Sequence, residues 1–426
     1  MANTYLTRTP SSNATSRFTF TASMWLKRSG LGEEVFWGSY SNSNYRFQLF
    51  FNSTDNLCVL NKDNSVQTIF LQTNRKFSDT NGWYHIYIAV KSSETTASDR
   101  VKIYVNGVRE TSFSSATYQS TSNDQAIGTS SYPFYIGKYG GTGGEFNGSM
   151  SHSYYVDGSI IDVTQFGSTD STTGEWKINT SPTIASYGNQ GHLILKDGNT
   201  ITDQSTNSNN FSLGGGTLTK TEDNPSNVFA TWNPLIGRHT DGTNLVPTLS
   251  NGNTTSFSDG STWQVGLSTL AASSGKYYTE VKWISDSNTR YSEIGLYEVD
   301  AFAQKITGYP YMPDMANCYG LRDSDGKIRT GGSATSYGVS YGPSNIISVA
   351  MDLDNNKLYY AKDGVWMNSA NPSSGTGGFS IIANKTYAFG LQQYAVGNIT
   401  FSTNFGNGYF GTTAVASAGT NASGNG

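Results

Sequence analysis

The sequence has 426 residues, a length that exceeds one β-sandwich of ordinary size and suits two. Charged residues make up only 14% of the chain and the formal net charge is -4, so there is no basic field for phosphate and we expect no nucleic-acid partner. Aromatic residues reach 13%, and glycine occurs 47 times against 10 prolines. This composition argues against disorder and favours turn-rich β structure.

Two further features bear on compartment and redox state. Cys58 and Cys318 lie in opposite halves of the chain, and we expect both to be free thiols. No apolar run approaches the length of a membrane span, so we expect no membrane insertion. Residues Met1–Leu6 lack the charged and apolar regions of a secretory signal, which predicts synthesis in a cytoplasm.

Alternating apolar residues predict antiparallel strands from the start of the chain. Between Ser16 and Arg28, every second residue from Phe18 to Leu26 is apolar, which predicts a half-buried strand. The central hairpin is expected at Val101–Val108, where Asn106-Gly107 suits a tight turn. A strand before it is expected over 83–90, and the second half repeats this pattern at 346–352 and 357–366, with Asp363-Gly364 as the turn.

Four segments of the first half together resemble a laminin-G or concanavalin A-like jelly roll. They occur in matching order and spacing, and the resemblance covers Met1 to Val163. It implies a β-sandwich domain, to which we assign residues 1–187. Some laminin-G-like domains use calcium, but the resemblance assigns no calcium ligand here. The four segments are Phe20–Lys27, Gly82–Ile86, Ile103–Gly107, and Tyr135–Lys138 leading to Phe146–Gly148.

Residues 188–234 are expected to connect two domains. The segment Asp223–Leu235 contains two prolines around an aromatic pair, which predicts a stiff connector. Within the preceding region, 162–167 and 173–177 are expected to be short helical or irregular pieces. The connector resembles those in virion proteins of tailed phages, in which a laminin-G-like unit precedes a second β domain.

The second half resembles a SPRY domain, which implies another β-sandwich over residues 235–410. The resembling features are a Gly-Lys-Tyr-Tyr-x-Glu strand at 275–280, an Asp-Leu-Asp turn at 352–354, an Asp-Gly turn and a terminal Asn404-Phe405-Gly406. The fold class is therefore all-β, with two antiparallel jelly-roll sandwiches in series. Residues 411–426 form a Gly/Ala/Ser tail without large apolar groups, so we expect a neighbouring chain to hold it.

The sequence favours a protein that is not an enzyme. Glycan-cleaving relatives of the concanavalin-like fold resemble one another in having Glu-x-Asp-x-Glu on one strand, where an acid and a nucleophile can flank the bond. This motif is absent. The nearest arrangement is Glu298-Val299-Asp300 with Glu293 upstream, which we interpret as a solvated strand end.

We expect no cofactor, with calcium left possible but unassigned to any residue. The four histidines, including His85 within a strand, lack metal-ligand spacing. Asp323-Ser324-Asp325-Gly326 resembles the start of a calcium loop, but Ala334 stands where the bidentate glutamate is required. A plain β-turn is the favoured interpretation. We therefore predict no metal site.

Loop aromatics and polar neighbours are the candidate ligand-binding residues. Sugar rings present apolar faces and hydroxyl edges, so tyrosines beside Asn, Asp and Gly suit them. Packing of these loops on a neighbouring subunit is an equally open interpretation, because tyrosine is also enriched at protein interfaces. Strand tryptophans such as Trp25, Trp83 and Trp283 are assigned to the core. The candidates are Tyr139, Asn147, Tyr309, Tyr311, Tyr337 and Tyr341.

These features together predict a structural protein on the surface of a phage virion, either a tail fibre or spike component or a capsid decoration. It would bind a host surface glycan, other virion proteins and further copies of itself. Two alternatives stay open. One is a polysaccharide-trimming enzyme of the particle, which the missing carboxylate motif disfavours. The other is a SPRY-type protein-interaction module of a cellular protein, which the lack of signalling domains disfavours.

Overall fold

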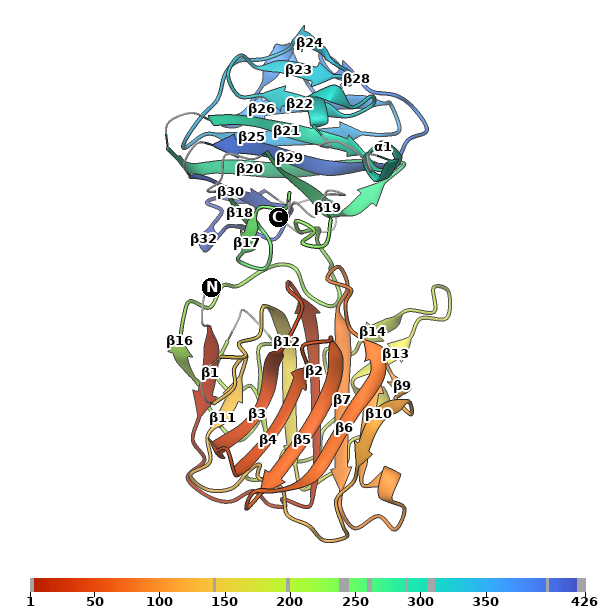
Figure 1. The fold of residues 1–426 in the computed structure, drawn as a ribbon, viewed down its shortest axis with the longest axis vertical. Coiled ribbons are helices and arrows are strands. Elements are labelled where there is room, and N and C mark those ends of the chain that lie inside the picture. Colours follow the sequence, from red (N-terminus) through yellow and green to blue (C-terminus); the bar gives the residue numbers. More distant parts are fainter. Residues whose placement is uncertain are drawn as a thin grey trace. The chain divides into compact units, whose positions relative to one another are not determined.

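The computed structural model describes residues 4–140, 143–196, 200–236, 245–258, 263–287, 290–304, 311–395 and 398–419. The chain divides into two compact units. Unit 1 comprises Met1–Lys220 with Asn224–Val228, and unit 2 comprises Thr221–Asp223 with Phe229–Gly426. Every pair of neighbouring named strands is antiparallel, so the predicted all-β class with two antiparallel sandwiches is confirmed (Figure 1).

Within the described residues, unit 1 consists of two large sheets and one small hairpin. The eight-stranded sheet has the order β10-β6-β5-β4-β3-β11-β1-β16, and the six-stranded sheet has the order β15-β12-β2-β7-β8-β9. The strands of the first sheet, in chain order, are β1 (Tyr5–Arg8), β3 (Glu34–Asn42), β4 (Tyr45–Phe51), β5 (Asn56–Asp63), β6 (Val66–Lys76), β10 (Phe113–Thr117), β11 (Phe134–Ile136) and β16 (Ser212–Gly215).

The six-stranded sheet faces the first across the core. Its strands are β2 (Thr19–Arg28), β7 (Tyr84–Lys91), β8 (Val101–Val105), β9 (Val108–Arg109), β12 (Gly148–Asp157) and β15 (His192–Ile194). Alternate residues of each strand point inward, as on β4, where Phe47, Leu49 and Phe51 are fully buried. The even residues from Phe20 to Leu26 on β2 fill the same core. The intervening side chains of each strand therefore point to the outer face of its sheet.

The central hairpin forms as the sequence predicts. Asn106 and Gly107 have φ of 49° and 75°, the left-handed values that a two-residue turn between β8 and β9 requires. A side chain at Gly107 would also collide with the Trp176 ring, because a Cβ there would lie 2.4 Å from it. The turn therefore requires glycine both for its backbone conformation and for packing.

The outer face of the six-stranded sheet is covered, which differs from the expectation of a half-buried strand at β2. Buried residues occupy both faces of β2, because the segment 159–187 packs on the outer one. That segment contains a 3-10 turn at Val163–Gln165 and the hairpin β13 (Gly167–Thr169) and β14 (Trp176–Ile178). Of the expected helical or irregular piece 173–177, residues 173–175 are turn and irregular backbone, while Trp176 and Lys177 belong to β14.

Within the described residues, unit 2 also consists of two large sheets and a small hairpin. The eight-stranded sheet has the order β17-β18-β30-β20-β25-β26-β27, with β28 paired to β26. Its strands are β17 (Thr248–Ser250), β18 (Thr255–Ser258), β20 (Lys276–Asp286), β25 (Ile346–Asp352), β26 (Lys357–Lys362), β27 (Val365–Trp366), β28 (Phe379–Ser380) and β30 (Ile399–Asn404).

The six-stranded sheet of unit 2 has the order β19-β29-β21-β22-β23-β24. Asp363 and Gly364, with φ of 50° and 81°, form the predicted turn between β26 and β27. A second small core lies on the outer face of this sheet, with Tyr297 and Met312, beside the helix α1 (Val299–Gln304). The strands are β19 (Gln264–Ala272), β21 (Arg290–Glu298), β22 (Tyr319–Arg322), β23 (Lys327–Thr330), β24 (Ser333–Ser336) and β29 (Tyr387–Ala395); β31 (Tyr409–Phe410) and β32 (Thr413–Ala414) form the hairpin.

The region expected as a connector belongs largely to the units themselves. Residues 188–220 lie in unit 1, because β15 pairs with β12 and β16 pairs with β1. Trp232 is buried in the core of unit 2. Of the expected tail, residues 413–414 form β32, and residues 420–426 lie outside the described part of the chain. No helix in the described ranges is long and apolar enough to span a membrane.

Candidate functional site

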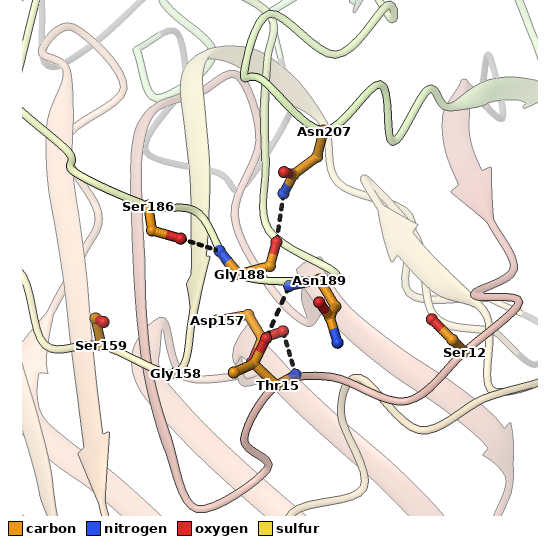
Figure 2. A pocket seen from close by; sticks show the side chains of 9 residues that line it. All are labelled: Ser12, Thr15, Asp157, Gly158, Ser159, Ser186, Gly188, Asn189 and Asn207. Atoms are coloured by element: carbon orange, nitrogen blue, oxygen red, sulfur yellow. Dashed lines mark hydrogen bonds between the residues drawn. The ribbon is translucent and has the colours of Figure 1, made fainter.

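Unit 1 contains a polar pocket of about 620 Å³ beside the end of β12 (Figure 2). Five chain segments meet there: the N-terminal segment, the end of β12, the turn after it, the loop before β15 and the loop before β16. The lining consists of hydroxyl, amide and carboxylate side chains with two glycines. The lining residues are Ser12, Thr15, Asp157, Gly158, Ser159, Ser186, Gly188, Asn189 and Asn207.

Asp157 assembles this pocket. Its carboxylate accepts hydrogen bonds from the backbone N–H groups of Thr15 at 2.6 Å, Ser16 at 2.8 Å and Gln190 at 3.1 Å. Gly188 has φ of 69°, and a Cβ there would lie 2.2 Å from the Asp157 carbonyl oxygen. Only glycine therefore allows the loop to approach so closely.

The same contacts limit the chemistry of the pocket. Three backbone donors occupy the Asp157 carboxylate, which holds the surrounding loops together. The remaining groups are hydroxyls and amides, which suit a hydroxyl-rich, uncharged ligand. Sequence reasoning missed this pocket, because its residues are scattered from 12 to 207 without a motif.

Tyr139, one of the predicted residues, lies in an aromatic corner on the outer face of the eight-stranded sheet. Arg46 Nη1 donates a hydrogen bond of 2.6 Å to the Tyr139 hydroxyl, and the Tyr40 ring lies 4.9 Å from the Tyr139 ring. Arg46 faces outward because Phe47 beside it faces the core, and Tyr40 is its cross-strand partner. Arg46 Nε is without a hydrogen-bond partner among the described residues. We call Tyr40, Arg46 and Tyr139 the Tyr139 site.

Asn147 has a structural environment. Its backbone N–H donates to Glu34 at 3.3 Å, and its carbonyl accepts from the Ser29 N–H at 2.8 Å. Glu34 in turn is paired with the fully buried Arg28 at 3.0 Å. Asn147 therefore lies beside a buried ion-pair cluster, an assignment that sequence reasoning did not anticipate.

The predicted tyrosines of unit 2 separate into three cases. Tyr309 lies outside the described residues. Tyr311 is half-buried, with its ring 5.5 Å from that of Trp263. The prediction for Tyr337 and Tyr341 is wrong, since both side chains are buried in the core of the sandwich. The Tyr341 hydroxyl donates to the Leu321 carbonyl at 2.8 Å, which fixes the ring inside.

The carboxylates that most resemble a catalytic arrangement are separated by the sheet. Glu293 and Glu298 are both buried, which corrects the expectation of a solvated strand end. Five residues apart on β21, they point to opposite faces and cannot flank one bond. Glu293 pairs with Arg329 at 3.0 Å, and Glu298 accepts the Ala301 N–H of α1 at 2.8 Å, so both have structural partners.

The remaining candidates for chemistry are also held by structural contacts. Asp325 pairs with Arg322, and the Gly326 N–H donates to the Arg322 carbonyl four residues earlier, so the segment closes as an α-turn and not as the predicted β-turn. His85 is stacked between the rings of Trp25 and Trp176, and burial lowers its pKa to about 3. Within the described ranges, no group of three His, Cys, Asp or Glu side chains is arranged to hold a metal. Cys58 and Cys318 are both free and buried.

Comparison with known proteins relates unit 1 to one superfamily. Residues 2–155 match the family model Laminin_G_3, described as the concanavalin A-like lectin/glucanases superfamily. The match lies within unit 1, where the sequence motifs predicted a laminin-G or concanavalin A-like domain. No curated protein matches the sequence.

Several solved structures are distantly similar to the chain. The SPRY domain of human HERC1 is 12% identical with a TM-score of 0.28, covering 35% of this chain and 87% of its own. The heptameric SAP-like pentraxin of Limulus polyphemus is 13% identical with a TM-score of 0.29, covering 38% and 74%. Domain 4 of the arabinanase AbnA of Geobacillus stearothermophilus, solved with arabinotriose, is 17% identical with a TM-score of 0.27, covering 34% and 63%.

Proposed function

We propose that this chain is a structural attachment protein on the surface of a tailed-phage particle, in which unit 1 binds a host surface glycan. The Tyr139 site is the observation on which the glycan proposal rests. It combines two aromatic rings with a guanidinium group on the outer face of the sheet, and all three residues are half-buried. Stacking faces beside a fixed donor are what a sugar ring requires.

The superfamily match supports the same proposal, because its description includes lectins as well as glucanases. Between these two activities we favour binding without catalysis. Glu293 and Glu298 point to opposite faces of β21, and the Asp157 carboxylate is occupied by backbone donors. Incubation with host polysaccharide should therefore release no reducing sugar, and release by wild type that Glu293→Gln or Glu298→Gln abolishes would contradict this part.

The virion location is supported by the pairing of two β-sandwich units and by the resemblance of the sequence Asp223–Leu235 to connectors in virion proteins of tailed phages. We further propose that the chain assembles as a homo-oligomer with other virion proteins. Immunogold labelling of intact source particles tests this. Gold should lie on tail fibres, tail spikes or the capsid surface, and label that stays with the soluble fraction of the lysate would contradict the location.

The glycan proposal predicts that Tyr139→Ala weakens binding to immobilised polysaccharide from the host surface. Loss of the ring removes the stacking face and the hydroxyl that positions Arg46, so the dissociation constant should rise at least about tenfold, equivalent to about 1.4 kcal/mol. Arg46→Ala should have an effect of the same direction. Surface plasmon resonance on a panel of such polysaccharides measures both.

A matched control comes from the same sheet. Tyr45 forms an aromatic pair with Tyr132, with ring centroids 5.8 Å apart. This pair shares no residue with the Tyr139 site. Tyr45→Ala should bind the polysaccharide like the wild type. Equal losses for Tyr45→Ala and Tyr139→Ala would indicate a general effect on the fold and would contradict the assignment of the site.

A further inference from the structure

Unit 2 has a compact cluster of aromatic side chains at one end of its six-stranded sheet. The ring centroids of Trp263, Tyr291 and Tyr394 form a triangle with sides of 5.3, 6.0 and 6.1 Å. Tyr311 adjoins this triangle through Trp263. We call the four residues the aromatic platform.

Strand register explains why the rings meet. Tyr291 on β21 is the cross-strand partner of Tyr394 on β29, and Trp263 immediately precedes Gln264 of β19, the partner of Gln393. The three rings therefore come from adjacent strands, which Figure 1 shows side by side in unit 2. Residues spaced far apart in the sequence are thus placed on one surface by the sheet.

The platform lies on the outer face of this sheet. On β21, Ile294 and Leu296 point into the sandwich core, so Tyr291 and Glu293 point the other way. Tyr291 is 46% exposed, and the other three rings are half-buried. Cross-strand pairing stabilises such rings, but it does not require that aromatic surface remain open to water.

The polar groups nearby define the class of ligand. Glu293, on the same face, is buried and paired with Arg329 at 3.0 Å, so its carboxyl group is not available to a ligand. Arg290, next to Tyr291, is paired with Asp286 at 2.6 Å. Among the described residues, the charged groups beside the platform are therefore already paired, which leaves no free cation for an anionic ligand and no free carboxylate to support a cation held on the rings. Its chemistry is that of aromatic faces edged by tyrosine hydroxyls.

We propose that the aromatic platform of unit 2 is a saccharide-binding site, separate from the Tyr139 site of unit 1. The ligand is a neutral oligosaccharide that places the apolar face of a sugar ring on Trp263 and its hydroxyls toward the tyrosines. The chain then has two glycan sites, one in each unit. This site does not depend on the proposed function of unit 1, because it has its own residues and its own strands.

Titration of the full chain with neutral tetrasaccharides of glucose, N-acetylglucosamine, mannose, galactose and arabinose tests this site by calorimetry. Trp263→Ala and Tyr394→Ala should weaken binding of the recognised sugar at least about tenfold, equivalent to about 1.4 kcal/mol. Trp263→Phe retains a ring and should retain most binding, while the ligand-induced change in tryptophan fluorescence disappears. Tyr277→Ala, which removes a tyrosine that is 45% exposed outside the platform, should bind normally.

The remaining outcomes overturn the proposal. Binding of no tetrasaccharide, or equal binding by wild type and Trp263→Ala, would reduce the platform to cross-strand packing. Binding of tetramethylammonium in place of sugar would assign it to a cation, and self-association lost in Trp263→Ala would assign it to a second copy. Tyr139→Ala provides the distinction from unit 1, because it should leave platform binding unchanged. Protection of Cys318 from a thiol reagent verifies that each variant is folded.

Discussion

Arg28→Met should destabilise unit 1 by about 3–5 kcal/mol, the range for removing one partner from a buried charge cluster. The Arg28 side chain is fully buried and pairs with Glu34 and Asp55, each at 3.0 Å. It also donates to the Phe77 carbonyl at 2.7 Å and the Gly32 carbonyl at 3.1 Å. Methionine would fill the volume but remove the guanidinium from two carboxylates and two carbonyls, and within the described part of the chain the carboxylates would keep only backbone N–H donors.

The buried cysteine of unit 1 offers a specific readout. Burial raises the pKa of Cys58 to about 12, so the folded thiol is both inaccessible and protonated. Pulsed thiol labelling along a urea gradient, with mass spectrometry of the Cys58 peptide, therefore reports unfolding of unit 1. Arg109→Ala, which breaks a partly exposed pair with Asp99, should leave the midpoint unchanged. An Arg28→Met midpoint equal to that of the wild type would contradict the structural role of the cluster.

Glu293 should make unit 2 less stable as the pH rises from 4.5 to 7. Burial outweighs the attraction of Arg329 and raises the pKa of Glu293 from 4.5 to about 7. The folded state then binds this proton more tightly than the unfolded state, so the free energy of unfolding falls across that window by up to about 3 kcal/mol. Glu293→Gln cannot titrate and should lose this slope, becoming more stable relative to wild type as the pH rises.

Labelling of Cys318, which is buried in unit 2, measures this effect at pH values between 4.5 and 7. The difference in unfolding free energy between Glu293→Gln and wild type should grow steadily with pH. Arg329→Gln should steepen the wild-type slope, because it removes the charge that lowers the pKa of Glu293. Parallel pH curves for the wild type and Glu293→Gln would show that Glu293 is not the group responsible.

The fold was predictable where the information is local. Asn106-Gly107 and Asp363-Gly364 specify their turns through the backbone of two residues, and alternation on β2 specifies which residues fill the core. The cover over the six-stranded sheet was not predictable, because 159–187 has no periodicity. It is held by individual contacts such as the hydrogen bond of 3.1 Å from Trp176 Nε1 to His85 Nδ1.

The candidate site was predictable only in part. Tyr139 stands out in the sequence because it adjoins a glycine run, but its partners Tyr40 and Arg46 are about a hundred residues away and meet it only through the sheet. Tyr337 and Tyr341 have the same glycine-rich surroundings, yet they turn into the core. Composition alone cannot separate these cases, because side-chain direction depends on what the loop packs against. Nothing in the sequence around Trp263 indicates that it lies beside Tyr394, because only the register between β19 and β29 brings the two residues together.

The pairing of β1 with β16 has a consequence for how unit 1 is made. Tyr5–Arg8 leaves the ribosome before the other strands of unit 1, and its outer partner Ser212–Gly215 follows only after some two hundred more residues. At about 5–20 residues per second, that interval is on the order of tens of seconds. During it, one edge of β1 has no strand beside it and is open to pairing with another nascent chain. A lower growth temperature and a low expression level should therefore favour soluble product, because they reduce encounters between unfinished chains.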